Sequence, residues 1–138
     1  MKKEVIVSFK SVNDYGDNNK DIMEFETEGT FFCKDGKYYL KYNETNELET
    51  VSVTLKLEEN KATILRFGSQ NTQMVIEKGK KQQSTYETNE STFSLAVIAD
   101  KVEINKEGKI NLSYKIELDD SVLSKNEINI TFYEKKEK

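Results

Sequence analysis

Arg66 carries the most distinctive side-chain chemistry of this sequence, because it is the only arginine among 21 basic residues. A guanidinium group is planar and permanently charged, and it can bind a carboxylate or phosphate through two parallel hydrogen bonds. If Arg66 faces the interior of the fold, it could hold the acidic group of a ligand. It could instead stack on an aromatic ring and bond to carbonyl groups at strand ends, or lie on the surface. The sequence leaves these three interpretations open.

Tyrosines form the second group of candidate functional residues, namely Tyr38, Tyr42, Tyr86 and Tyr114. Each lies in a segment with strand-like alternation and combines an apolar ring with a hydroxyl that needs a partner when it is buried. An interior lined by tyrosines and one arginine could hold an amphipathic small molecule with an acid group. The alternative is that these rings fill the core, since tyrosine is a favoured strand residue.

Histidine is absent from the chain, and this absence excludes several classes of site. The usual general base near neutral pH is missing, as are imidazole ligands for metals and the histidine-dependent serine and cysteine nucleophiles. Cys33 is the only cysteine, so no disulfide can form within the chain. We therefore predict no cofactor and no catalytic residue, and we favour a non-enzymatic protein.

One calcium-loop spacing occurs in the sequence, with candidate ligands at positions 1, 3, 5 and 12 of the loop in Asp17, Asn19, Asp21 and Glu28. Ile22 stands where such a loop needs glycine, and the flanking segments alternate as strands do. We therefore expect a solvated loop and no metal site. A hydrolase with paired carboxylates remains a distant hypothesis, because no spacing in the sequence selects a pair.

Charge and length limit the classes of partner. The net charge is −4, with 25 acidic and 21 basic residues interspersed, so no basic face is expected for nucleic acid or anionic membranes. No apolar run approaches the roughly 20 residues of a membrane-spanning helix, and the first residues alternate in polarity. We expect a single cytoplasmic domain over residues 1–138, with a frayed charged tail at 134–138.

The elements that must position Arg66 are two neighbouring strands. Residues 50–57 alternate between apolar and polar side chains, which indicates a strand with one buried face. A turn at 58–61 follows. The return strand can be read with Ala62, Ile64 and Arg66 inward, or with Thr63, Leu65 and Phe67 inward. A two- or four-residue loop favours the first reading, and a bulged loop favours the second.

The rest of the chain repeats this pattern. Alternating segments are separated by turn residues and fall at 4–12, 22–27, 30–33, 37–42, 73–77, 82–88, 92–104, 110–118 and 128–132. Asp35-Gly36 gives the clearest hairpin signal, Gly29 predicts a bend or bulge, and the parity changes near Asp100. Roughly ten short strands with little helix predict an all-β fold, and we expect one antiparallel up-and-down β-barrel.

Several short motifs, in this order, carry a family resemblance: Gly29-Thr30-Phe31, Tyr39-Leu40-Lys41-Tyr42-Asn43-Glu44, Arg66-Phe67-Gly68, Tyr86-Glu87-Thr88, Gly108 with Tyr114, and Ser124-Lys125-Asn126 before Ile128 and Ile130. Together they resemble the YwiB-like family, small bacterial proteins assigned to a domain of unknown function. The resemblance implies a calycin-type, lipocalin-like barrel in the bacterial cytoplasm and no established activity.

The resemblance also bears on Arg66. The spaced family pattern of apolar, apolar, Arg and Gly matches Ala62, Ile64, Arg66 and Gly68, which implies that Arg66 faces inward. The sequence departs from the family at Ser91, where glycine is expected, and at Ala99, where threonine is expected. These departures weaken any polar role for residues 88–99.

The leading functional hypothesis is a non-enzymatic barrel that binds a small amphipathic or acidic ligand in its interior. The ligand-binding residues would be Arg66, Tyr42, Tyr86, Tyr114 and Glu44. The alternative is a filled barrel that works as a protein–protein interaction module and forms a homodimer.

Overall fold

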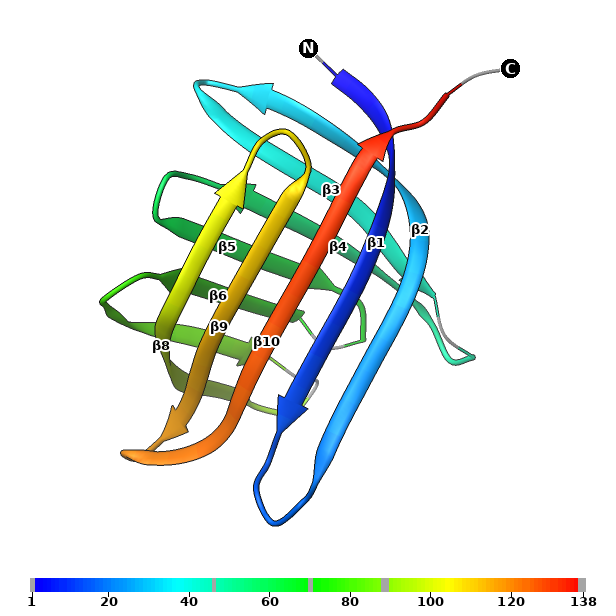
Figure 1. Cartoon of the computed structure of the whole chain (residues 1–138). Coiled ribbons are helices and arrows are strands. Elements are labelled where there is room, and N and C mark those ends of the chain that lie inside the picture. The colour runs from blue at the N-terminus through cyan, green and yellow to red at the C-terminus, as the bar shows by residue number, and fades with distance from the viewer. Residues whose placement is uncertain (1, 46, 70, 88–89, 137–138) are drawn as a thin grey trace.

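The chain forms a single closed barrel of antiparallel strands (Figure 1), seen in a computed structural model. The structure describes residues 2–45, 47–69, 71–87 and 90–136, and only the backbone of Tyr86, Glu87 and Phe93. The ten strands in these ranges are β1 (Lys2–Asp14), β2 (Lys20–Lys34), β3 (Lys37–Thr45), β4 (Thr50–Leu57), β5 (Lys61–Phe67), β6 (Asn71–Glu77), β7 (Lys81–Glu87), β8 (Thr92–Asn105), β9 (Lys109–Leu118) and β10 (Ser121–Glu134).

The strand order is the order of the chain. Each strand pairs with the strand before it and the strand after it, and β1 closes the barrel by pairing with β10 from Val5↔Glu134 to Asp14↔Lys125. The predicted all-β, up-and-down barrel is therefore confirmed. The described ranges contain no helix, and hence none that could cross a membrane.

Because the strands alternate in direction, the barrel has two distinct ends. At the first, which we call the arginine end, lie the connections β1–β2, β3–β4, β5–β6, β7–β8 and β9–β10. At the second, which we call the Glu58 end, lie the connections β2–β3, β4–β5, β6–β7 and β8–β9, together with the first residues of β1 and the last residues of β10.

Apolar side chains fill the middle of the barrel. Inward positions alternate with outward ones along each strand, and the largest fully enclosed side chains are Leu40, Leu55, Leu57, Ile76, Ile110, Leu112 and Ile130. Toward the Glu58 end, the ring of Phe31 lies 4.7 Å from that of Phe132 and 5.6 Å from that of Tyr38. The core is thus continuous from the centre to the Glu58 end.

Turn chemistry explains most of the strand boundaries. Asp35 and Gly36 both have positive φ, 53° and 78°, between the paired residues Lys34 and Lys37, so the predicted hairpin is confirmed. The parity change near residue 100 is confirmed as a register shift between Ala99 and Lys101.

Gly29 does not interrupt its strand and forms no bulge, so the bulge reading of this residue is wrong. β2 runs without a register shift against both neighbours. A Cβ atom at residue 29 would lie 2.6 Å from the carbonyl oxygen of Lys41 and 3.0 Å from the Val7 side chain. Glycine is therefore needed for the close approach of β3 and not for a turn.

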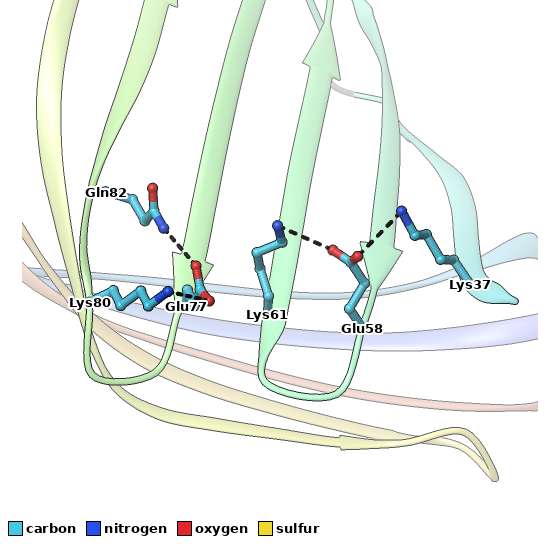
Figure 2. Close-up of polar contacts among 6 residues, drawn as sticks. All are labelled: Lys37, Glu58, Lys61, Glu77, Lys80 and Gln82. Atoms are coloured by element: carbon cyan, nitrogen blue, oxygen red, sulfur yellow. Dashed lines mark hydrogen bonds and ion pairs between the residues drawn. The ribbon is translucent and has the colours of Figure 1, made fainter.

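Ion pairs join neighbouring turns at the Glu58 end (Figure 2). The Glu58 carboxylate lies 3.5 Å from Lys37 Nζ and 3.5 Å from Lys61 Nζ. Burial opposes the charged form of Glu58, but Lys61 and Lys37 outweigh it and lower its pKa below the ordinary value. Next to this group, Glu77 lies 3.4 Å from Lys80 and accepts a 2.6 Å hydrogen bond from Gln82.

The charged C-terminal segment begins within β10, which ends at Glu134. The Lys135 backbone N–H donates a 2.8 Å hydrogen bond to the carbonyl oxygen of Glu4. Residues 137 and 138, the last part of the segment expected to fray, lie outside the described residues.

Candidate functional site

Arg66 lies on the inward face of β5, near the arginine end. Its strand pairs with β4 through Leu57↔Ala62, Leu55↔Ile64 and Val53↔Arg66, and the Glu58 N–H donates a 2.9 Å hydrogen bond to the Lys61 carbonyl. This is the tight loop that the first reading of the turn requires. The inward orientation of Arg66 is confirmed, because Ala62 and Ile64, which share its parity, are buried.

Glu44, on β3, binds the fork of Arg66. Arg66 Nη1 and Nη2 donate hydrogen bonds of 2.8 Å and 2.5 Å to the two carboxylate oxygens of Glu44. The side chains are 35% and 10% exposed, respectively. Burial opposes the charge on Arg66, but the hydrogen bonds and charge of Glu44 raise its pKa above the ordinary value. The carboxylate that Arg66 holds is thus one of the chain's own, an arrangement none of the three interpretations included.

Two buried tyrosines lie beside this ion pair. Burial raises the pKa of Tyr114 to about 12, while the charge of Arg66 acts in the opposite direction. Burial and the charge of Glu44 raise the pKa of Tyr42 even further, again opposed by Arg66. Both hydroxyls therefore stay protonated at neutral pH and can donate as well as accept hydrogen bonds. Arg66 is close enough to act on both tyrosines.

Neither tyrosine hydroxyl is bonded to a described residue. Both side chains are almost completely buried. Neither hydroxyl oxygen, however, belongs to the polar side-chain atoms that are fully enclosed and have no hydrogen-bond partner. A water molecule can therefore touch each oxygen. A buried hydroxyl needs such a partner, because leaving it without one costs about 1–3 kcal/mol.

The structure brings Tyr42, Glu44, Arg66 and Tyr114 together, as the candidate set requires. Tyr86 lies on β7 opposite Thr72 and Phe93, but its side chain is outside the described part of the structure. Tyr38 lies in the other half of the barrel, toward the Glu58 end, where its ring stacks on Phe31.

Two aromatic residues next to the set were not singled out in the sequence. Phe9 and Phe25, paired across β1 and β2, stack with ring centroids 4.7 Å apart, and they lie 6.4 Å and 6.1 Å from the Tyr42 ring. They provide an apolar surface beside the polar groups. Pairing the two strands about the turn at Gly16 would have found them.

Asn126 adds a buried amide near Tyr114. It donates hydrogen bonds of 3.0 Å to Ser124 Oγ and 3.4 Å to the Tyr114 carbonyl oxygen. Ser124 and Asn126 share the inward parity of Ile128 on β10, and this shared parity was the signal in the sequence. The inward face of this strand thus changes from apolar to polar toward the arginine end.

Described cavities touch the set only in part. One of about 310 Å³ is lined by Tyr114, Asn126 and charged residues of β1, β2, β8 and β10. Another of about 230 Å³ touches Tyr42 and Gly29 but is lined mainly by exposed residues of the outer wall, such as Glu28, Lys41 and Ser52. Arg66 lines neither. A larger one of about 490 Å³ lies at the Glu58 end, beside Tyr38, Leu57 and Ile104. Within the described ranges, no cluster of three or more acidic, cysteine or histidine side chains could hold a metal ion.

Comparisons with known proteins agree on the barrel and assign no activity. The model of a family described as a domain of unknown function (DUF1934) matches residues 7–130. The uncharacterized beta-barrel protein YwiB of Bacillus subtilis (strain 168) is 28% identical over 141 residues, which cover 96% of each chain. The crystal structure of the ywiB protein from Bacillus subtilis superposes with a TM-score of 0.84 at 21% identity, covering 98% of this chain and 94% of that one.

Proposed function

This chain belongs to the DUF1934 family, a domain of unknown function, and from that premise we propose that it is a non-enzymatic binder of a small amphipathic ligand at the arginine end of its barrel. The pair of buried tyrosine hydroxyls that water can touch and that have no partner in the described chain carries this proposal. The site would lie within the barrel, as in the lipocalin-like barrels that the sequence resembles, and we place the protein in the bacterial cytoplasm.

The chemistry of the site favours a ligand with one polar head and one flat apolar part. Hydroxyls of Tyr42 and Tyr114 can donate to the head, and so can the guanidinium N–H groups that Glu44 does not use. The stacked rings of Phe9 and Phe25 offer the apolar surface. Such a mixture of apolar walls and a few placed polar groups is typical of small-molecule sites.

The Glu44 carboxylate decides between a neutral and an acidic head group. It already neutralises Arg66, so a carboxylate on the ligand would meet a net neutral pair and would also be repelled by Glu44. A neutral head that accepts hydrogen bonds meets no such repulsion. We therefore place neutral amphipathic ligands before acidic ones.

Titration with two matched probes tests this proposal. Calorimetry with 2-naphthaleneethanol and 2-naphthylacetate compares a neutral and an acidic head on the same ring system. We expect saturable one-to-one binding of the alcohol and weaker binding of the acid. Tyr42→Phe and Tyr114→Phe should each weaken binding of the alcohol by about 3- to 10-fold, the equivalent of one hydrogen bond.

Tyr133→Phe is the matched control, because Tyr133 is exposed on the outer surface. It should bind the alcohol as the unaltered protein does. The proposal fails if neither probe binds saturably, or if the control weakens binding as much as the two buried variants. Tighter binding of the acid would reverse the order of head groups and return Arg66 to the role of ligand counter-ion.

A protein-interaction module is the second candidate function, and the exposed apolar side chains favour it. Eight large apolar residues that are exposed lie on hairpins and strand ends at the arginine end: Tyr15, Ile22, Met23, Leu48, Phe67, Leu118, Val122 and Leu123. Exposed apolar surface is a feature of contact sites between proteins. Sedimentation velocity over a range of concentrations tests the homodimer, and a constant monomer mass would exclude it.

A further inference from the structure

A nine-residue segment of β2 has a paired strand on one side only. β2 pairs with β1 over its length, from Lys2↔Phe32 to Asp14↔Lys20, whereas it pairs with β3 only from Gly29↔Tyr42 to Lys34↔Lys37. Residues 20–28 therefore form a free edge, which we call the β2 edge. In Figure 1 the lower half of β2 has β1 on one side and no strand on the other.

The backbone of the β2 edge is available for pairing. In an antiparallel strand, every second residue directs its N–H and C=O groups away from one neighbour, so about half of these groups face the open side. No described backbone group outside β1 forms a hydrogen bond with residues 20–28. Proline and β-bulges are two features that commonly block the addition of a strand to an edge. The chain contains no proline, and the pairing of β2 with β1 shows no bulge, so the β2 edge has neither feature.

The outer face of the β2 edge carries a row of carboxylates. Glu24, Glu26 and Glu28 are spaced by two residues, and the side chains of Glu24 and Glu28 are 64% and 66% exposed. Their contacts are with the β1 side and the chain end: Lys10 lies 3.7 Å from Glu24, Ser8 donates a 3.2 Å hydrogen bond to Glu26, and Lys135 binds Glu28.

The inner face of the same segment carries two large apolar side chains, Met23 and Phe25, between Asp21 and Thr27. Met23 is exposed, and the half-buried ring of Phe25 stacks on Phe9. A strand added to this edge would therefore place one row of its side chains beside carboxylates and the other row beside Met23 and Phe25.

We propose that the β2 edge binds an extended segment of a partner protein in which lysine or arginine alternates with apolar residues. The added strand would bond to the free backbone groups, its cations would lie along the glutamate row, and its apolar side chains would pack near Met23 and Phe25. Nine residues of edge span about 30 Å, so a segment of about eight residues is enough.

Charge complementarity selects this occupant over a second copy of the chain. Two β2 edges paired antiparallel would bring their glutamate rows together, and like charges on neighbouring strands are destabilising. An anionic membrane surface meets the same repulsion. This proposal does not depend on ligand binding at the tyrosine cluster.

Peptide titration followed by NMR tests the β2 edge. The probes are two peptides, Lys-Val-Lys-Thr-Lys-Val-Lys-Thr and its counterpart with glutamate in place of every lysine. We expect the basic peptide to bind at least about tenfold more tightly, to weaken as salt is added, and to slow amide exchange at alternate residues within 20–28. A basic peptide methylated on alternate backbone nitrogens should lose this binding.

A charge exchange supplies the matched variants. The double variant Glu24→Lys and Glu26→Lys should reverse the preference and select the acidic peptide. The control, Glu103→Lys with Glu127→Lys, makes the same change in net charge at exposed sites on β8 and β10 and should keep the original preference.

Three outcomes would overturn the proposal. The first is equal binding of the methylated peptide, which would show that the backbone edge is not used. The second is a reversal of preference by the control pair, which would reduce the effect to net charge. The third is self-association that protects residues 20–28 and disappears in the Glu24→Lys and Glu26→Lys variant, which would assign the edge to a second copy.

Discussion

The pairing of Arg66 with Glu44 gives the sharpest prediction about stability. Exposed ion pairs contribute about 0.2–1 kcal/mol, whereas breaking a buried pair costs about 3–5 kcal/mol. The Glu44 side chain is only 10% exposed and that of Arg66 is 35% exposed, so this pair lies between the two limits. We expect Arg66→Met to lower the free energy of unfolding by about 2 kcal/mol, because it leaves the Glu44 carboxylate without its counter-charge.

A double-mutant cycle separates the interaction from other effects of the substitutions. Glu44→Gln should cost about 1 kcal/mol, because a glutamine oxygen can still accept one of the two hydrogen bonds. The double variant should lose about 1 kcal/mol less than the sum of the single variants. Urea unfolding followed by circular dichroism measures each value, provided that the slope with denaturant stays unchanged.

The exposed pair of Lys10 and Glu24 is the control for this cycle. Its atoms are 3.7 Å apart with both side chains more than half exposed, so its coupling should stay below about 0.5 kcal/mol. A coupling between Arg66 and Glu44 as small as the control value would refute the reasoning. It would mean that the fork is hydrated in solution and that Glu44 does not neutralise it.

Three further predictions concern other parts of the barrel. As pH rises from 10 to 12, the unaltered protein should lose about 2 kcal/mol more of its free energy of unfolding than the Tyr114→Phe variant does. The reason is that the folded protein keeps the Tyr114 phenol proton, whereas the unfolded chain loses it near pH 10. Urea unfolding at each pH measures this difference. Glu58→Gln should cost about 0.5 kcal/mol at pH 7, and this difference should shrink as pH falls below 4, because ion pairs lower the pKa of Glu58; acid titration of stability checks it. Gly29→Ala should cost about 2–3 kcal/mol in urea unfolding, and clearly more than Gly68→Ala, because its new methyl group would strike the Lys41 carbonyl, whereas that at residue 68 first meets the end of a glutamate side chain.

Local signals in the sequence were sufficient to predict the barrel. Strand alternation and turn residues are short-range properties, and every ladder between the described strands except β1–β10 joins neighbours in the chain. The Asp35-Gly36 hairpin and the inward orientation of Arg66 both follow from the length and residue types of one turn.

Properties that depend on distant strands were harder to predict. The contact between Arg66 and Glu44 requires the registers of β3, β4 and β5 together, and no single turn specifies all three. Gly29 was read as a local break, but its role is set by the approach of Lys41 from the next strand. The free β2 edge arises because β2 pairs with β3 only from Gly29 onward. The alternation of polar and apolar residues along a strand does not indicate how far its neighbour extends.

Closure of the barrel by β1 and β10 has a consequence for how the chain folds. In each hairpin, pairing can start at the short turn and extend along the two strands. Most contacts therefore form between residues that are close in sequence, and the entropic cost of loop closure is low. Among the described strands, the ladder from Val5↔Glu134 to Asp14↔Lys125 alone joins the two extremes of the chain. The ends also lie near each other at the Glu58 end, where the Lys135 N–H bonds to the Glu4 carbonyl. A circular permutant that links these ends and opens the chain at an exposed turn would make β1 and β10 a local hairpin. The slowest step of folding would then be the pairing of the two strands on either side of the opened turn.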